Sequence, residues 1–182
     1  MGNRGILHDD LQRLGSARWR HKAWICCVPS FKGRRRVPMS PGAYTELFFL
    51  DEAVALAAGH RPCAECRRAA FDAFRDAWAE ATGSCARAPE IDRALHRARV
   101  TRNRTQVRQT GDLADLPDGT FILRDGRAHL VLADRLLPFT TEGYGSPLRR
   151  PSGAATILTP APTLTVLRHA YRPQLHPTAG RV

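Results

Sequence analysis

The residues with the clearest chemical signature are two cysteines in the stretch GHRPCAECRR, Cys63 and Cys66. A Cys-x-x-Cys pair supplies half of a tetrahedral metal site. The pair opens a predicted helix, whose dipole and free N–H groups favour thiolates. Arg61, Arg67 and Arg68 add positive charge beside it. We therefore predict that the two cysteines bind a metal ion instead of serving as small core residues.

The other half of such a site must come from elsewhere, and WICCVPSF offers Cys26 and Cys27. This stretch alternates as a strand does, so the two side chains point to opposite faces, one as a ligand and the other into the core. The start, MGNRGILHDD, is unlike a signal peptide, so the five cysteines are expected to stay reduced and to favour metal binding over disulfides. Cys85 follows a predicted helix in a loop, and we interpret it as a bystander.

The stretch FFLDEAVALAAGHRPCAECRR resembles the zinc-binding domain of Ada-type DNA repair proteins, which has an aromatic start, a short EALAAG helix and an RPCxxC knuckle. Upstream, CVPSF is similar to the family's Cys-Arg-Pro-Ser-Cys stretch. The resemblance covers roughly residues 24–68. It implies that Cys27, Cys63 and Cys66 bind zinc, and that Cys27 accepts a methyl group from a DNA phosphate.

The chain departs from that pattern at Phe31, which stands in place of the family's second cysteine and cannot bind zinc. An insertion, KGRRRVPMSPG, also lengthens the path to the knuckle. If a histidine completes the site, it is less anionic than a four-cysteine site, and its thiolates are poorer nucleophiles. We therefore expect one structural zinc ion, with methyl transfer to Cys27 as an alternative. The fourth ligand is left open among Cys26, His8, His21 and His60, with Cys26 and His8 favoured.

The charge balance of the chain points to a nucleic-acid partner. Its 182 residues carry 28 Lys and Arg against 17 Asp and Glu, a formal net charge of +11. A basic domain most often meets nucleic acid, and arginine forms a rigid fork that fits phosphate oxygens. We predict DNA, double-stranded or damaged, as the partner; RNA stays open, and an interaction domain with incidental charge is an alternative. The predicted phosphate contacts are Arg34, Arg35, Arg36, Arg61, Arg67, Arg68, Arg97 and Arg104.

No apolar run approaches the roughly 20 residues that a membrane helix requires. We expect no membrane partner and a cytoplasmic, nucleoid-associated protein. The sequence does not indicate an oligomeric state.

Four polar side chains are candidates for catalysis: Asn3, His8, Asp9 and Glu46. Asparagine, histidine and an acid together can orient and activate water, and Glu46 interrupts an apolar stretch where a carboxylate pKa can be raised. We predict a zinc-containing DNA-binding protein of DNA repair, and a DNA glycosylase is the enzyme to test first. Such an enzyme needs a basic groove, a pocket for a flipped base and a group that places water. A non-catalytic zinc-dependent DNA-binding or regulatory module is the alternative.

The periodicity predicts an α+β fold, with a small zinc-stabilised Ada-like domain packed against a C-terminal hairpin and helix region. Residues 1–85 form the Ada-like region with an N-terminal arm. Residues 86–182 form a basic helix, a β-hairpin and a short helix that share one core with it. The expected strands cover 20–31 and 44–49, and a hairpin turns at Asp125-Gly126. Three helices are expected: Glu52–Ala58, capped by Asp51; Pro62 to Ala81, which buries Phe71, Phe74 and Trp78; and a last helix capped by Thr163. The tail after Pro177 is expected to be loose.

Overall fold

Four helices and two β-sheets form a mixed α+β fold in the computed structural model, which describes residues 1–33 and 37–180. This confirms the predicted fold class. No helix within these ranges is long and apolar enough to cross a membrane. The helices are α1 (Glu52–Ala57), α2 (Arg68–Thr82), α3 (Ala88–Arg99) and α4 (Ala161–Arg168).

The larger sheet has the strand order β4-β9-β5-β6-β7-β8, and every neighbouring pair is antiparallel. The predicted hairpin is β5–β6, and its turn residues Asp125 and Gly126 both have positive φ, 49° and 73°. Two such residues give the twist that a two-residue hairpin turn requires. The strands are β4 (Gln109–Asp112), β5 (Phe121–Arg124), β6 (Arg127–Leu132), β7 (Arg135–Pro138), β8 (Leu148–Arg149) and β9 (Ala154–Ile157).

A small sheet near the N-terminus joins β1 (Gly2–Asn3), β2 (Ile25–Cys26) and β3 (Arg61–Pro62). β1 pairs with β2 in antiparallel fashion, whereas β2 and β3 are parallel. The long strands predicted over 20–31 and 44–49 are wrong: the first is reduced to two residues, and the second contributes one bridge, between Leu47 and Gly2. Proline at position 29 cannot donate to a ladder, which is consistent with the early end of β2.

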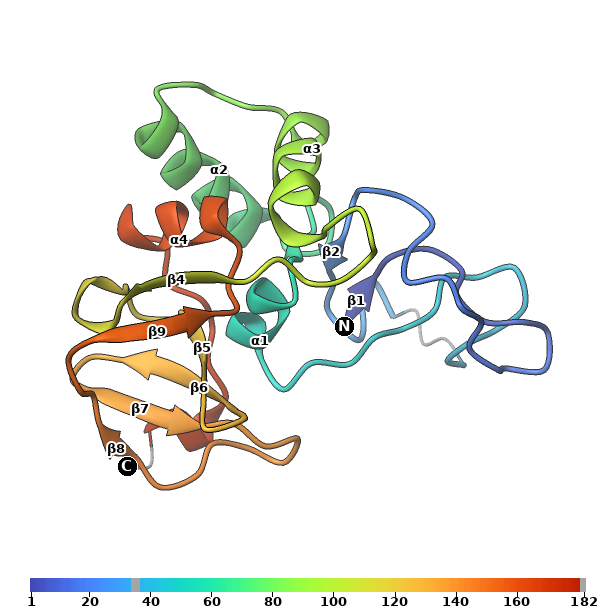
Figure 1. Cartoon of the computed structure of the whole chain (residues 1–182). Helices are drawn as coiled ribbons and strands as arrows, with labels where there is room; N and C mark the ends of the chain where they lie inside the picture. The colour runs from blue at the N-terminus through green and yellow to red at the C-terminus, as the bar shows by residue number, and fades with distance from the viewer. Residues whose placement is uncertain (34–36, 181–182) are drawn as a thin grey trace.

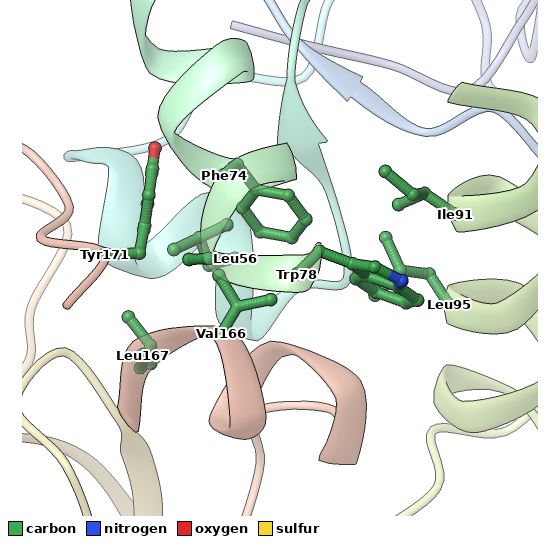
Figure 2. Packing of buried hydrophobic residues seen from close by; sticks show 9 residues of the cluster. Leu56, Phe74, Trp78, Ile91, Leu95, Val166, Leu167 and Tyr171 are labelled. Atoms are coloured by element: carbon green, nitrogen blue, oxygen red, sulfur yellow. The ribbon is translucent and has the colours of Figure 1, made fainter. Parts of the chain in front are cut away.

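Helices α2, α3 and α4 lie on one side of the larger sheet, while residues 1–33 and 37–50 extend away from it (Figure 1). Phe71, Phe74 and Trp78 of α2 are buried as predicted. Figure 2 shows how Phe74 and Trp78 meet Leu56 of α1, Ile91 and Leu95 of α3, and Val166 and Leu167 of α4. This apolar cluster draws on both halves of the chain. None of the three apolar clusters contains a residue before Leu50.

The ends of the helices show which local signals hold. Asp51 caps α1 as predicted, because its Oδ1 accepts from the N–H of Val54 at 2.9 Å. Helix α2 begins at Arg68 and not at Pro62, because Pro62 belongs to β3. Thr163 does not cap α4, whose N-cap is Pro160.

The segment that leads into the predicted loose tail is attached to the start of α1. The N–H of His176 donates to Asp51 at 3.0 Å, and the hydroxyl of Tyr171 donates to Glu52 at 2.7 Å. Residues Pro177–Gly180 form a 3₁₀ turn in which Ala179 is buried. The prediction of a loose tail is therefore wrong for residues 178–180, because the Thr178 hydroxyl accepts from the Tyr144 N–H at 3.0 Å and Ala179 is buried.

Candidate metal centre

Three cysteine sulfurs come together where the small sheet meets α2. The Sγ atoms of Cys27, Cys63 and Cys66 all lie within 4.8 Å of one another, and all three cysteines are free. Cys27 follows β2 and Cys63 follows β3, and the parallel register, with Cys26 opposite Pro62, sets these two residues side by side. Cys66 lies in the turn that precedes α2. The three cysteines named by the Ada resemblance could therefore bind one metal ion.

Backbone N–H groups point at these sulfurs. The N–H of Val28 donates to the Sγ of Cys66 at 3.4 Å, and that of Glu65 donates to Cys63 at 3.5 Å. The pKa of Cys63 is lowered to about 5, mainly because the Cys27 thiol bonds to it, and this contact raises the pKa of Cys27. Negative charge is thus favoured on Cys63. A sulfur must be deprotonated to bind a metal ion, so this environment suits a cation.

The four candidates for a further ligand lie elsewhere. Cys26 points away from the cluster, is buried, and accepts from Arg67 Nη1 at 3.5 Å. His8 bonds to the hydroxyl of Thr45 at 2.6 Å. His21 is exposed, and His60 packs against Trp24 and Phe49. Among the described residues, the metal-ligating group contains the three cysteines and none of these four side chains.

The cysteine cluster opens onto a cavity of about 1,070 Å³, which Asn3 and Glu46 also line. Asn3 is held by a bond from the Gly5 N–H to its Oδ1 at 2.8 Å. Glu46 uses Oε2 to accept from the Met39 N–H at 2.8 Å, while its Oε1 is buried and has no hydrogen-bond partner within the described ranges. Two of the four predicted catalytic residues therefore share a cavity with the candidate metal ligands. Phe31, at the position of the missing cysteine, lines the same cavity.

A scan of family models, a search of curated proteins and a search of solved structures each find no match. The Ada-type likeness rests on the sequence motifs alone, and the candidate site is judged on its geometry.

His8 and Asp9 do not line the cysteine cavity. His8 is buried against Thr45, and the exposed Asp9 bonds to the N–H and the guanidinium of Arg13. Bonds from Arg13, its backbone first, lower the pKa of Asp9. Both residues fix the shape of the N-terminal arm, and the predicted catalytic group is reduced to Asn3 and Glu46.

The predicted phosphate contacts divide into three groups. Arg61 and Arg67 form ion pairs with Asp92 and Glu52, at 2.8 and 3.0 Å, and Arg61 is also buried, so these contacts correct the prediction that the two arginines face phosphates. Arg34, Arg35 and Arg36 lie outside the described residues. The remaining three, Arg68, Arg97 and Arg104, are exposed.

Two arginines with structural roles were not predicted from the sequence, the half-buried Arg4 and the buried Arg99. One signal was present for Arg99: it follows Ile91 and Leu95 at spacings of four, which places all three on the buried face of α3. No comparable signal exists for Arg4. Its Nε donates to Nε2 of the buried His60 at 3.2 Å.

The burial of His60 beside Arg4 leads to a prediction of how the stability of the fold depends on pH. Burial, and then the charges of Arg4, Arg99 and the N-terminus, holds the pKa of His60 well below its usual value. The unfolded chain takes up a proton near pH 6.5 and the folded chain does not, so stability is full above pH 6.5 and falls below it. Between pH 7.5 and 5.5 we expect His60 to remove about 1.4 kcal/mol of unfolding free energy.

Urea unfolding at the two pH values measures this loss. His60→Gln keeps an acceptor for Arg4 but does not titrate, so its pH dependence should be weaker than that of the parent chain by this amount. His169→Gln, at an exposed position, is the control and should keep the parent dependence. An unchanged dependence in His60→Gln would contradict the prediction.

Proposed function

We propose that this protein is a zinc-containing, DNA-binding protein of DNA repair, and that it hydrolyses the glycosidic bond of a damaged or modified base. One observation carries the proposal: three convergent cysteine sulfurs open onto a large cavity that is also lined by Glu46, a residue with one buried carboxylate oxygen that has no hydrogen-bond partner in the described part of the chain. Soft thiolate ligands suit zinc, and three protein ligands are typical of catalytic zinc sites. Zinc, when bound, supplies a Lewis acid beside the cavity.

The lining of the cavity suits a base taken out of a duplex. Phe31, Tyr44 and Phe48 are aromatic, and Phe48 is 66% exposed. Aromatic faces stack on any base, and enzymes that process bases extrude them into pockets. The net charge of +11 supports an anionic polymer as the partner. The exposed Arg68 lies two residues after Cys66, at the start of α2, and is available for phosphate contact.

Asn3 and Glu46 have distinct roles in this proposal. Hydrolysis joins a water oxygen to C1′ of the sugar, breaks the bond to the base and releases one proton from the water. We assign Glu46 to accept that proton, because it lines the cavity and its Oε1 has no other partner in the described part of the chain. Asn3, held at its Oδ1 by Gly5, orients groups in the cavity through its amide.

Replacement of Glu46 by glutamine tests this assignment. We expect base release to fall at least about a hundredfold, because a positioned general base contributes roughly 10²–10⁴ in rate. Duplexes carrying deaminated, alkylated or crosslinked bases are incubated with the chain, and abasic sites are detected after alkali. DNA affinity should change little, since glutamine has the same shape. Glu80→Gln, on the exposed face of α2, should behave as the parent.

Two experimental results would contradict the proposed activity and support a different function. If no duplex on the panel loses a base while binding still falls steeply with salt, the protein is a non-catalytic DNA-binding module. If a labelled methyl group moves from DNA to Cys27, the alternative suggested by the Ada resemblance is correct. Metal analysis should give about one zinc per chain.

A further inference from the structure

A second cavity, of about 300 Å³, lies between the N-terminal arm, the end of α1 and the loop after α3. It shares no lining residue with the cysteine cavity. Within the described ranges no acidic side chain lines it. Its charged and aromatic residues are Arg4, Arg18, Arg99, Arg104, Trp19 and Trp24.

Two arginines enclose one tryptophan at the base of this cavity. The guanidinium carbons of Arg4 and Arg99 lie 3.7 and 3.8 Å from the centre of the Trp24 ring. Both distances are close to van der Waals contact with the ring plane, so two guanidinium groups cannot fit on one face. Trp24 therefore lies between them, and its electron-rich faces attract both cations.

Neither cation forms an ion pair with a carboxylate in the described part of the chain, although the charge of the nearby Asp92, itself paired with Arg61, partly favours charged Arg99 and opposes the lowering of its pKa by burial. Arg99, only 2% exposed, donates to the backbone carbonyls of Lys22 and Gly59, and its Nε has no partner within these ranges. Arg4 donates to the carbonyl of Ala58 and to a histidine ring. Burial lowers the pKa of Arg4 to about 10 and of Arg99 to about 9. Buried charges without a counter-ion are costly, so this arrangement favours an anion.

The structural role of the two arginines does not remove this excess charge. Ala58 and Gly59 directly follow α1, so both guanidinium groups bind carbonyls at the C-terminal end of that helix. A helix terminus offers about half an elementary charge, and this helix has only six residues. Two full positive charges exceed that.

We propose that this cavity binds the phosphomonoester group of a nucleotide, either free or at the end of a nucleic-acid strand. Arg4 and Arg99 form the base of the site, the exposed Arg18 and Arg104 its rim, and the half-buried Trp19 a stacking surface for the base. A monoester carries up to two negative charges and matches the two buried cations. An internal phosphodiester carries one, and its strand would have to enter and leave a small cavity.

Binding to the purified full chain tests the site. The probes are AMP, inorganic phosphate, adenosine, and a 12-residue single strand with either a 5′-phosphate or a 5′-hydroxyl, followed by calorimetry and tryptophan fluorescence. We expect AMP to bind at least about tenfold more tightly than adenosine. Arg104→Gln or Arg18→Gln should weaken AMP binding about tenfold. Arg102→Gln, an exposed arginine of the same loop that does not line the cavity, should leave it unchanged.

The rim variants keep the test decisive, because Arg4 and Arg99 also support α1 and their replacement can unfold the chain. Equal binding of AMP and adenosine, or equal loss in Arg104→Gln and Arg102→Gln, would overturn the proposal. If AMP binds as tightly as the 5′-phosphorylated strand, the ligand is a free nucleotide; if that strand binds more tightly than AMP and the 5′-hydroxyl strand, it is a strand end. Zinc content and base release depend on other residues, so either proposal can fail alone.

Discussion

Serine in place of Cys63 is expected to lower zinc affinity by more than a hundredfold and to release residues 1–49 from the rest of the fold. Outer groups that merely orient metal ligands are worth about 10–100-fold in affinity, so a direct ligand is worth more. The sulfur of Cys63 lies beside those of Cys27 and Cys66. With only three cysteine ligands in the cluster, the loss of one leaves too few to hold the metal ion.

The release of the N-terminal region follows from its poor core. Residues before Leu50 contribute nothing to the three apolar clusters, and β1, β2 and β3 have two residues each. A metal ion shared by Cys27 and the segment 63–66 would be the strongest link between this region and α2. Free energies of opening differ between such regions of one protein, so the helices and the larger sheet should stay folded.

Metal analysis, competition with a chelator and limited proteolysis measure the two effects. Cys85→Ser is the matched control, because Cys85 is exposed and outside the cluster. Cys26→Ser tests whether Cys26 is a fourth ligand. Retention of zinc excludes Cys26 as a ligand, and loss of zinc identifies it as one. A Cys63→Ser chain that still holds one zinc and resists protease would show that the cluster is not the site.

Alanine in place of Asp92 is expected to lower the free energy of unfolding by about 3–5 kcal/mol. This is a large part of the roughly 5–15 kcal/mol by which a whole domain is stable. Asp92 accepts two bonds from Arg61, at 2.8 Å each, and both side chains are nearly inaccessible to water. Without the carboxylate, a guanidinium stays buried with no counter-ion. Arg61 belongs to β3, which positions Cys63, so zinc content should fall as well.

Denaturant unfolding of the Asp92→Ala chain measures this loss. Asp72→Ala is the control, because the Arg68–Asp72 pair is exposed at 3.9 Å and should be worth less than about 0.5 kcal/mol. Replacing both partners, as Arg61→Met with Asp92→Leu, should recover much of the loss, because no charge is then left buried. Equal stability of Asp92→Ala and Asp72→Ala would contradict the assignment.

Features with a local cause were predictable from the sequence. Asp51 caps α1 through an atom three residues away, and Asp125-Gly126 supplies the two positive φ angles of a hairpin turn. The buried stripe of α2 follows from helical spacing. The pairing of Cys63 with Cys66 was predictable because thiolate chemistry and spacing are both restrictive, whereas the choice of Cys27 over Cys26 came from the Ada resemblance.

Features that depend on distant partners were not predictable. Arg61 reads as a surface arginine until the structure brings Asp92, 31 positions along the chain, against it. His8 has the right chemistry for catalysis, yet its neighbour Thr45 occupies its ring nitrogen. Parallel pairing of β2 with β3 involves only two residues from each strand, too few to leave a period in the sequence.

The attachment of the tail to α1 sets an order on biosynthesis. Asp51 binds Tyr144 and His176, which follow it by 93 and 125 positions, and Glu52 binds Tyr171, which follows it by 119 positions. These contacts form only after their downstream partners have been synthesised. While a ribosome is still translating the larger sheet, these two carboxylates have emerged, and within the chain they can bind only near neighbours such as the Val54 N–H and Arg67. Helix α1 and its cap Asp51 therefore complete their contacts only after residue 176 has left the exit tunnel. Nascent chains halted earlier should remain bound by chaperones.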